Sequence, residues 1–326
     1  MALTLIVTIA MIGTWRATAQ ESDWKKLPDM PVERWEAATV VLEDKLYILG
    51  GYTDGTLSSK ILNVFDPKDG SWTRLQDLPS SITHFNAVLD GRTIWFAGGF
   101  KDGYKGHAIA EVWNYDLDKD RYTAAPLLPA PRGGGGLALV GRKLHFISGI
   151  KADRITDADD HWVLDLDDWE KGSAQWKNLA PIPVGRNQFA TKVLGGKIYA
   201  MGGQFGHDNG QDNQELVHIY DPETDTWSDG PELPSGHSHA EGGTFISGDR
   251  IYMVGGHTTA KDGSGKRGRD QNVIALTPGG QWEVVATLPM PLSSPAAAII
   301  GGKIYVAGGQ PRGGVILADM WVRDAP

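Results

Sequence analysis

The sequence predicts an all-β fold: a six-bladed β-propeller with four-stranded antiparallel blades and a ring closed by the N-terminal strand. The first observation is a pair of small residues that recurs six times: Gly50-Gly51, Gly98-Gly99, Ser148-Gly149, Gly202-Gly203, Gly255-Gly256 and Gly308-Gly309. The second is an aromatic residue followed seven positions later by proline: Trp24 and Pro31, Trp72 and Pro79, Tyr122 and Pro129, Trp176 and Pro183, Trp227 and Pro234, and Trp282 and Pro289. A repeat of about 50 residues is typical of propeller blades.

Composition supports one large β domain. The chain has 326 residues, of which 41% are hydrophobic, so it can bury a sizeable core. It contains 42 glycines and 18 prolines, which fits many short strands joined by turns. All-β closed folds of this length often form a single domain.

Each repeat is predicted to contain four strands, illustrated by the first complete one. Residues 37–41 form a small, apolar first strand, and residues 45–49 form a second strand that runs into the glycine pair. Residues 61–65 form the third strand, and the fourth carries Trp72. The Asp66-Pro67 step opens the turn between the last two, because proline presets φ and aspartate bonds the following backbone.

The order of the two patterns predicts how the ring closes. The first aromatic–proline pair precedes the first glycine pair, whereas only one strand around Trp321 follows the last glycine pair. The segment from Trp24 to Pro31 therefore supplies the outer strand of the last blade. Such closure leaves only short, protected sheet edges.

The N-terminus has the pattern of a secretory signal. An apolar run from Leu3 to Gly13 precedes the small residues Ala17 and Ala19, so residues 1–19 are expected to be a signal peptide and residues 20–326 the propeller. We therefore expect a secreted or periplasmic protein. Because no Lys or Arg precedes the run, an uncleaved anchor or a misassigned start is the alternative. No later stretch is expected to span a membrane.

Charge and cysteine content exclude several functions. The net charge of −9 opposes binding to nucleic acid. The basic residues Lys266, Arg267 and Arg269 are interpreted as a solvated loop tip. The chain has no cysteine, which excludes disulfides, cysteine nucleophiles and thiolate metal sites.

The positions of the long loops indicate which face of the propeller is expected to bind ligands. The loops between the second and third strands are long and polar at residues 150–160, 204–213 and 257–271, whereas turns on the opposite face are short. These loops share a face with the connections between repeats. Binding residues concentrate on such loops of a rigid scaffold.

The double glycine, the spaced aromatic residues and the arginines that open the first strand (Arg34, Arg132 and Arg186) resemble the kelch-repeat family from about Ser22 to the end of the chain. The resemblance implies the propeller fold, but kelch propellers serve both as enzymes and as binding platforms. It also implies a pocket-facing residue eleven positions before the aromatic or histidine that precedes each glycine pair. These residues are Glu36, His84, Gly134, Gln188, Glu241 and Ser294.

Residues directly after the glycine pairs are also expected to face the mouth of the propeller: Tyr52, Phe100, Ile150, Gln204, His257 and Gln310. Planar polar groups and aromatic faces suit a sugar. We therefore expect Gln188, Gln204, Gln310, Tyr52 and Phe100 to bind substrate. A solvated funnel with incidental polar residues is the alternative.

Acid–base chemistry is the first functional hypothesis. Glu241 or Glu36 would act as base and His84 or His257 as acid. Arg186 or Arg312 would hold a substrate carboxylate. Bacterial secreted kelch proteins include sialic-acid mutarotases with a Glu after a glycine pair and a nearby Arg. Blade six has Gln310 and Arg312 in similar places, and glutamine cannot act as a general base.

A divalent metal is a further possibility. His237, His239 and Glu241 alternate along a predicted strand, and alternate strand residues face the same side. His207 and Asp208 lie in the preceding long loop and would complete a ligand set. The competing interpretation is that His239 replaces the arginine that opens the first strand in other repeats. The acidic residues 157–160 are interpreted as a solvated loop, and His145 and His161 as structural.

Two functions follow from these observations. The first is a carbohydrate-processing epimerase, mutarotase or lyase acting in the central mouth. The alternative is a non-catalytic platform whose long loops bind a protein or a glycan.

Overall fold

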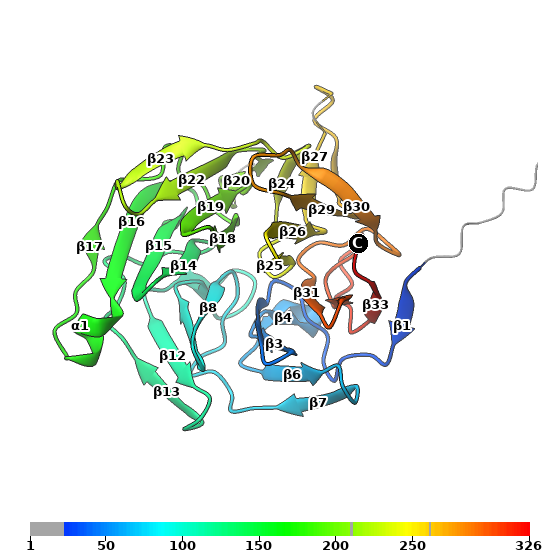
Figure 1. Ribbon diagram of the computed structural model, residues 1–326, viewed down its shortest axis with the longest axis horizontal. Helices are drawn as coiled ribbons and strands as arrows, with labels where there is room; N and C mark the ends of the chain where they lie inside the picture. Colours follow the sequence, from blue (N-terminus) through cyan, green and yellow to red (C-terminus); the bar gives the residue numbers. More distant parts are fainter. Residues whose placement is uncertain (1–22, 209–210, 261) are drawn as a thin grey trace, which may run out of the picture.

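A computed structural model of the chain describes residues 23–208, 211–260 and 262–326. The expected signal peptide, residues 1–19, and the expected mature start at Gln20 lie outside this range. Among the described residues, six sheets have four antiparallel strands each, and they surround a common centre (Figure 1). We number them in chain order as sheets 1 to 6.

The strand bounds follow the same plan in every sheet, from the innermost strand outward. Sheet 1 contains β2 (Ala38–Leu42), β3 (Lys45–Leu49), β6 (Leu62–Asp66) and β7 (Ser71–Arg74). Sheet 2 contains β8 (Asn86–Asp90), β9 (Thr93–Ala97), β12 (Val112–Asp116) and β13 (Arg121–Ala124). Sheet 3 contains β14 (Gly136–Val140), β15 (Lys143–Ile150), β16 (Asp157–Asp165) and β17 (Lys177–Asn178).

The second half of the chain repeats this plan. Sheet 4 contains β18 (Ala190–Leu194), β19 (Lys197–Met201), β22 (Val217–Asp221) and β23 (Thr226–Asp229). Sheet 5 contains β25 (Thr244–Ser247), β26 (Arg250–Val254), β29 (Asn272–Leu276) and β30 (Glu283–Thr287). Sheet 6 contains β31 (Ala296–Ile300), β32 (Lys303–Ala307), β33 (Met320–Asp324) and β1 (Lys25–Leu27).

Contacts between sheets run around the centre. The innermost strands touch in the order β2, β8, β14, β18, β25 and β31, and β31 also touches β2. In sheet 6, β1 pairs antiparallel with β33, with Lys25 opposite Val322 and Leu27 opposite Met320. The fold is therefore all-β and built of antiparallel four-stranded sheets, as the sequence predicts, and it is consistent with a propeller.

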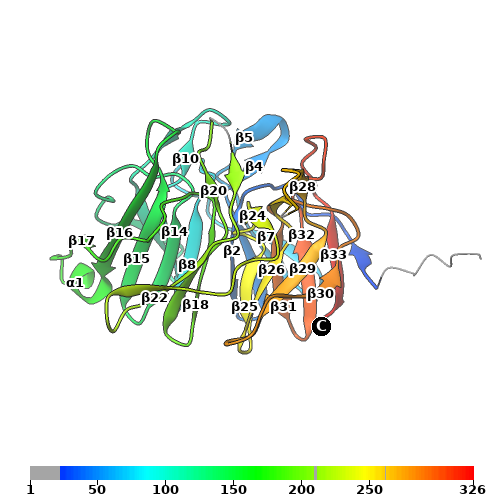
Figure 2. The ribbon, with the colours of Figure 1, turned by 90° about the horizontal axis from the view of Figure 1, so that it is seen from above.

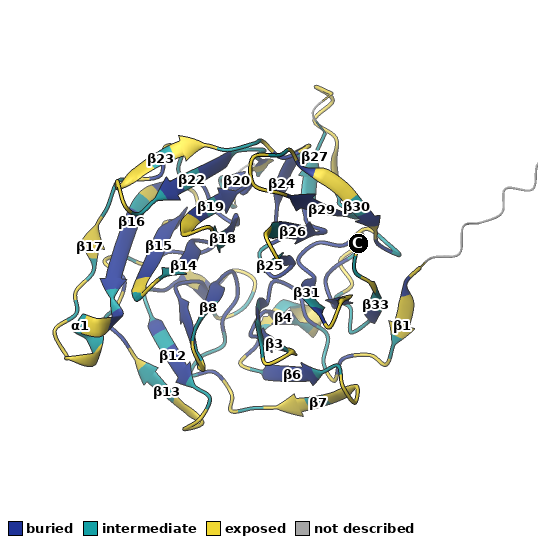
Figure 3. Cartoon of the chain, in the orientation of Figure 1, coloured by how far each residue is buried: buried dark blue, intermediate teal, exposed yellow. Residues whose placement is uncertain are grey.

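Burial separates the sheets into an apolar interior and exposed outer strands (Figure 3). In β3, Leu46, Ile48 and Leu49 are almost fully buried, because both faces of this strand pack against neighbouring sheets. The turn after β6 forms as the sequence predicts, since Asp66 Oδ1 accepts a hydrogen bond from the Lys68 backbone N–H at 3.0 Å.

Smaller elements lie in the long loops at one end of the molecule (Figure 2). They are η1 (Asp54–Thr56) and the short strands β4 (Tyr52–Thr53), β5 (Leu57–Ser58), β10 (Phe100–Lys101), β11 (His107–Ala108), β20 (Gln204–Phe205), β21 (Asp212–Asn213), β24 (Gly236–Ser238), β27 (His257–Thr259) and β28 (Arg267–Arg269). The helix α1 (Leu166–Glu170) is an insertion in sheet 3 that the repeat pattern does not predict. No helix among the described residues is long and apolar enough to cross a membrane.

The long loops share one face, as the sequence predicts. Arg154 of the first predicted loop bonds Asp208 of the second. In the second and third loops, Asn213 Nδ2 donates to Thr259 Oγ1 at 3.1 Å, and Arg267 donates to the Gln211 carbonyl. Consecutive loops are therefore tied together around this face.

Candidate functional site

Six residues that precede the innermost strands form the floor of the site, and we call them the inner ring. They share a left-handed backbone conformation: Glu36 (φ 54°), His84 (φ 54°), Gly134 (φ 60°), Gln188 (φ 51°), His239 (φ 55°) and Ser294 (φ 45°). Backbone hydrogen bonds join neighbours: the Gly134 N–H donates to the His84 carbonyl, and the Gln188 N–H donates to the Gly134 carbonyl. The left-handed conformation in non-glycine residues is uncommon and points to a functional or structural constraint.

The glycine pairs make room for this ring. In sheet 1, Trp35 pairs with Tyr52, directly beyond the glycine pair. A Cβ on Gly51, whose φ is +83°, would lie 2.7 Å from the Trp35 carbonyl oxygen. The second glycine of the pair is therefore required for the close approach that presents Glu36 to the centre.

Glu36 lies among three imidazoles from three other sheets. Its Oε2 is 2.8 Å from His84 Nε2, and its Oε1 is 3.6 Å from His239 Nε2. His207 Nε2 lies 3.3 Å from His84 Nε2. The connections and loops before sheets 1, 2 and 5 and within sheet 4 thus bring one carboxyl group and three imidazoles together.

Neighbouring hydroxyl groups orient two of these imidazoles. Thr83 Oγ1 lies 2.8 Å from His84 Nδ1, and Ser238 Oγ lies 2.7 Å from His239 Nδ1. In both cases the hydroxyl belongs to the preceding residue and leaves Nε2 directed towards Glu36. In each ring, the hydroxyl contact at Nδ1 therefore selects the orientation that places Nε2 towards the Glu36 carboxyl group.

Burial dominates the electrostatics of this cluster. Desolvation raises the pKa of Glu36 to about 8. Burial lowers the pKa of His84 to about 3 and that of His207 to about 4, and it holds the pKa of His239 well below the usual value. At neutral pH the cluster is therefore a protonated carboxyl group, which can donate a proton, beside neutral imidazoles, which can accept one.

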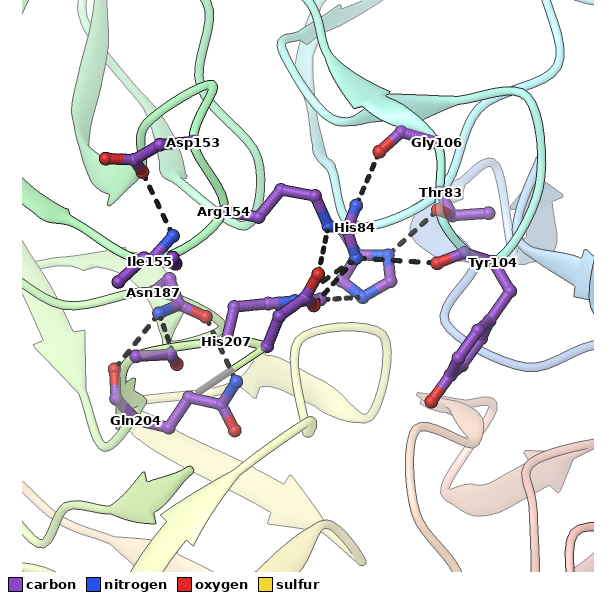
Figure 4. Close-up of polar contacts among 12 residues, drawn as sticks. Thr83, His84, Tyr104, Gly106, Asp153, Arg154, Ile155, Asn187, Gln204 and His207 are labelled. Carbon is purple, nitrogen blue, oxygen red and sulfur yellow. Dashed lines mark hydrogen bonds and ion pairs between the residues drawn. The ribbon is translucent and has the colours of Figure 1, made fainter. Parts of the chain in front are cut away.

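Arg154 covers one side of the cluster (Figure 4). Its guanidinium donates to Asp208 Oδ2 at 2.8 Å and to the Gly106 carbonyl at 2.6 Å, and Nη2 lies 3.2 Å from His207 Nδ1. It also lies 4.2 Å above the Phe100 ring. The hydrogen bond from Arg154 holds the pKa of Asp208 at about 2, so this carboxylate is charged and engaged.

Arg269 lies on the other side. Its Nε and Nη2 donate to the backbone carbonyl and to Oε1 of Gln310, at 2.8 and 2.6 Å. Within the described residues Nη1 has no hydrogen-bond partner. Arg269 also faces His257, whose pKa burial and then the Arg269 charge lower to about 3. The interpretation of Arg269 as part of a solvated tip is therefore wrong, although Lys266 and Arg267 are exposed.

A small cavity of about 10 Å³ lies beneath the ring, lined by Glu36, His84, Gln188, Glu241 and Ser294. Its volume corresponds to about one water molecule. The Gln188 side chain is buried, and both its amide atoms lack a hydrogen-bond partner among the described residues. Burial, with a smaller contribution from Glu36, raises the pKa of Glu241 to about 7.

Two positions differ from the predicted alignment of sheet 5. The inner-ring residue is His239, because Glu241 and Gly242 are two additional residues before β25. Glu241 still lines the cavity beneath the ring. The residue equivalent to Arg34 is His237, since its carbonyl accepts from Gly203 N–H as the Arg34 carbonyl accepts from Gly309 N–H. The assignment of His239 to that position is therefore wrong.

The predicted metal ligands do not form one site. His237 Nε2 lies 2.6 Å from the Gly255 carbonyl, away from the inner ring, and Arg154 engages Asp208. His207 and His239 approach Glu36 from different sheets. Across residues 23–208, 211–260 and 262–326, no group of three or more His, Asp or Glu side chains is arranged to hold a metal ion.

Of the two predicted arginine clamps, Arg186 does not reach the site, whereas Arg312 lies close enough to act electrostatically on Arg269. Arg186 is fully buried, and its guanidinium donates to the carbonyls of Gly202, Val184 and Ala200. It ties backbone segments of sheet 4 together and has no access to a substrate. Arg312 lies exposed in the loop after the last glycine pair.

The predicted substrate-binding residues fall into two groups. Tyr52 and Phe100 are buried, and their rings contact the edge of the His84 ring at centroid distances of 5.7 and 5.0 Å. They support the cluster from behind. Gln204 is buried and donates to Asn187 Oδ1, and Gln310 is bonded to Arg269. His257 stacks on His239 with ring centroids 3.9 Å apart.

Sequence reasoning missed Arg154 and Arg269. Both lie in long loops that have no counterpart in other repeats, so no alignment could place them. The available signal was an arginine in each loop, Arg154 in the loop of sheet 3 and Arg269 in the loop that begins at His257. The acidic segment 157–160 is also less solvated than expected, since Asp157 accepts from Asn187 Nδ2 and from the Gly206 N–H.

Comparisons with known proteins agree with the fold and its repeats. The family model described as the KLHDC2/KLHL20/DRC7 Kelch-repeats domain matches residues 11–203, and the Kelch motif matches residues 185–234. A solved structure titled "Structure of YjhT" superposes with a TM-score of 0.73 at 15% identity, covering 90% of this chain and 95% of that one. At that identity the likeness concerns the fold alone.

Curated relatives carry kelch names as well. Kelch repeat-containing protein At3g27220 of Arabidopsis thaliana is 26% identical over 93% of this chain and 76% of its own length. Kelch-like protein terF of Aspergillus terreus is 24% identical over 88% of this chain and 64% of its own length. Kelch-like protein 36 of Mus musculus matches 68% of this chain but only 35% of its own length. Since one family model spans more than half of the residues, the chain belongs to the kelch-repeat family.

Proposed function

We propose that this kelch protein acts on a small acidic carbohydrate in the mouth above the inner ring, with Glu36 and His84 as the acid–base pair. The observation that carries the proposal is the buried contact of 2.8 Å between Glu36 Oε2 and His84 Nε2, with the His239 imidazole 3.6 Å from the same carboxyl group. A carboxyl group whose pKa is raised to about 8 is suited to proton transfer near neutral pH.

The reaction type follows from this pair. Epimerisation, mutarotation and elimination each need a proton removed at one atom and delivered at another. Glu36 and His84 offer two exchangeable sites at hydrogen-bond distance. Arg269, with one free guanidinium nitrogen within the described part of the chain, replaces Arg186 and Arg312 as the group proposed to hold a substrate carboxylate.

Access requires movement of the loops. Glu36 is only 8% exposed, and the Arg154–Asp208–His207 contacts cover it. We propose that these loop contacts open for substrate and close over it, which would exclude water during proton transfer.

The enclosing architecture is proposed to be a ring of six blades, one per four-stranded sheet, closed by the N-terminal strand. The pairing of β1 with β33 and the cyclic contacts of the innermost strands support this. A secreted or periplasmic location is proposed from the N-terminal sequence pattern alone.

The test is a screen of purified protein against uronic and sialic acids by one-dimensional NMR, which detects anomer exchange, epimerisation and elimination. Turnover should fall by about 100-fold or more in Glu36→Gln and His84→Asn, since general acid–base groups contribute about 10²–10⁴-fold. Glu223→Gln, at an exposed turn, is the matched control and should keep the wild-type rate. Turnover that survives Glu36→Gln would contradict the assignment of the pair.

A binding platform is the second candidate, and the surface of the loops favours it. Large apolar residues are exposed in four of the loops around the mouth: Leu57 (65%), Tyr104 (59%), Ile155 (54%) and Val315 (61%). Exposed apolar residues on one face are typical of protein or glycan contacts. Replacing Leu57, Tyr104 and Ile155 together by serine should abolish partner binding without changing sugar turnover, whereas Glu36→Gln should do the reverse.

A further inference from the structure

A second cavity lies on the axis of the molecule, on the opposite side of the inner ring from the mouth. It has a volume of about 320 Å³ and is lined by the innermost strands β2, β8, β14, β18, β25 and β31. We call it the axial channel. These strands run from the loop-bearing end of the molecule to the opposite end (Figure 2). Its volume falls within the range of about 300–1,000 Å³ of small-molecule pockets.

The channel wall is apolar except at a few positions. Valine, leucine, isoleucine, alanine and phenylalanine side chains make up most of the lining, and Lys192 in β18 is its one charged residue. Towards the open end, Val41, Leu89 and Val193 are half-buried, so the entrance is apolar as well. A ligand entering here meets hydrocarbon first and a single ammonium group further in.

Lys192 has no hydrogen bond or ion pair with any residue in the described ranges. The carboxylate that acts on it electrostatically, Glu241, lies beneath the inner ring and is not within ion-pair distance. Burial lowers the pKa of Lys192 to about 8, so at neutral pH the ammonium form predominates without a counter-ion. Lys192 is half-buried and lines the channel, so a ligand in the channel can supply the missing counter-ion.

A second polar group in the channel also lacks a partner. Two of the three threonines that line it are satisfied, since Thr191 Oγ1 donates to the Leu137 carbonyl and Thr244 Oγ1 donates to the Ala240 carbonyl. Thr39 Oγ1 is buried and has no hydrogen-bond partner among the described residues. An ammonium group and a hydroxyl group without partners among the described residues therefore belong to the lining of the same channel.

We propose that the axial channel binds an aliphatic carboxylate, with the carboxylate paired to Lys192 and hydrogen-bonded by Thr39 and the alkyl chain packed against the apolar wall. One positive charge matches one negative charge, which favours a carboxylate over a dianionic phosphate. The apolar entrance favours an alkyl chain over a sugar. This site is separate from Glu36 and does not depend on the proposed carbohydrate chemistry.

The test is isothermal titration of the full chain with octanoate and, as the uncharged match, 1-octanol. Wild-type protein should bind octanoate saturably, and Lys192→Met should weaken binding by about tenfold or more, as expected for loss of a charge-assisted hydrogen bond. Lys192→Arg should retain binding. Lys197→Met is the control, because Lys197 lies on the adjacent strand and pairs with Asp221 at 2.8 Å outside the channel.

A labelling experiment on wild-type protein removes any dependence on the folding of variants. Reductive methylation with mass spectrometry reads the reactivity of each lysine, and octanoate should protect Lys192 while leaving Lys197 unchanged. Absence of saturable octanoate binding, equal affinity in Lys192→Met, or equal labelling of Lys192 with and without octanoate would each overturn the proposal. Equal affinity for octanol would show that the charge has no part in binding and would overturn it too.

Discussion

Glu36 is the residue on which the proposed chemistry depends, and its protonation state follows from its position. The left-handed backbone turns it to the centre, where only imidazoles and the small cavity surround the carboxyl group. No lysine or arginine forms an ion pair with it in the described part of the chain. The nearby charges of Arg154 and Arg269 offset burial only in part, and the neutral acid is favoured.

The first prediction concerns the pH dependence of stability. A carboxyl group with a pKa of about 8 in the folded protein and about 4.5 when unfolded costs nothing below pH 4.5 and destabilises the fold progressively as pH rises through 8. Glu36→Gln removes this penalty. Relative to wild type, the variant should gain about 2–4 kcal/mol in unfolding free energy between pH 5 and pH 9.

Urea unfolding at the two pH values measures this gain. Glu223→Gln, an exposed carboxyl group, should show none. Direct ¹³C NMR titration of the Glu36 carboxyl group gives an independent reading. A titration midpoint near 4.5 would contradict both the burial argument and the assigned role.

At the same scale, the repeat predicts most of the inner ring but not all of it. Counting back eleven residues finds Glu36, His84 and Gln188, because those connections have equal length. It fails at His239, because sheet 5 carries two more residues before its first strand. Arg154 and Arg269 escape prediction for a different reason: they come from loops without repeat symmetry, and only tertiary contacts bring them to the mouth.

At the scale of elements, strands are more predictable than insertions. The second strand of sheet 1 was expected at residues 45–49 and is Lys45–Leu49, because alternation and the glycine pair fix both of its ends. Helix α1 was not expected, since it depends on a local N-cap in which Asp165 accepts from the backbone N–H groups of Asp167 and Asp168. This N-cap signal spans only a few residues and falls between the Ser148-Gly149 pair and Trp176 of the repeat.

Strands β15 and β16 carry a buried pair of imidazoles, which gives the second prediction. His145 Nδ1 lies 3.0 Å from His161 Nε2, and burial lowers the pKa of His145 to about 3 and that of His161 to about 4. The two neutral imidazoles make their full contribution to the free energy of unfolding above pH 6.5. This contribution is lost as pH falls towards their pKa values in the folded protein. His145→Phe should reduce the acid-induced loss of unfolding free energy between pH 7.5 and 4.5 by about 2 kcal/mol.

Chemical denaturation at both pH values tests this expectation. His107→Gln is the matched control, because His107 is exposed, and it should lose as much stability on acidification as wild type. If His145→Phe and wild type lose equal stability, the buried pair is not an acid-sensitive element.

At the scale of the whole molecule, the proposed closure of the ring depends on the contacts between the first and last sheets. Strand β1 connects the N-terminal end to sheet 6 through three residue pairs with β33, and contacts between β2 and β31 join the same two sheets near the centre. Trp24 anchors this strand: it is buried, and its Nε1 donates to the Thr287 carbonyl of sheet 5 at 2.7 Å. If the ring is closed as proposed, this junction contributes to holding the inner ring in place.

A disulfide across this junction provides the third prediction. Lys25 and Val322 are directly opposite in the antiparallel register, a placement compatible with disulfide geometry, and the natural chain has no cysteine to form a competing bond. The double variant Lys25→Cys with Val322→Cys should oxidise to one intramolecular disulfide. Closing almost the whole chain should stabilise it by about 2–4 kcal/mol over its reduced form.

Thermal unfolding of the oxidised and reduced forms measures this difference, with Lys25→Cys alone as the control for the substitution. Hydrogen exchange at the inner ring should also slow on oxidation, because opening at β1 and β33 would otherwise let sheets 1 and 6 separate. An oxidised form that unfolds like the reduced one, or a disulfide that forms only between molecules, would mean that β1 does not join the two ends and that the mouth is held together by the other sheet contacts alone.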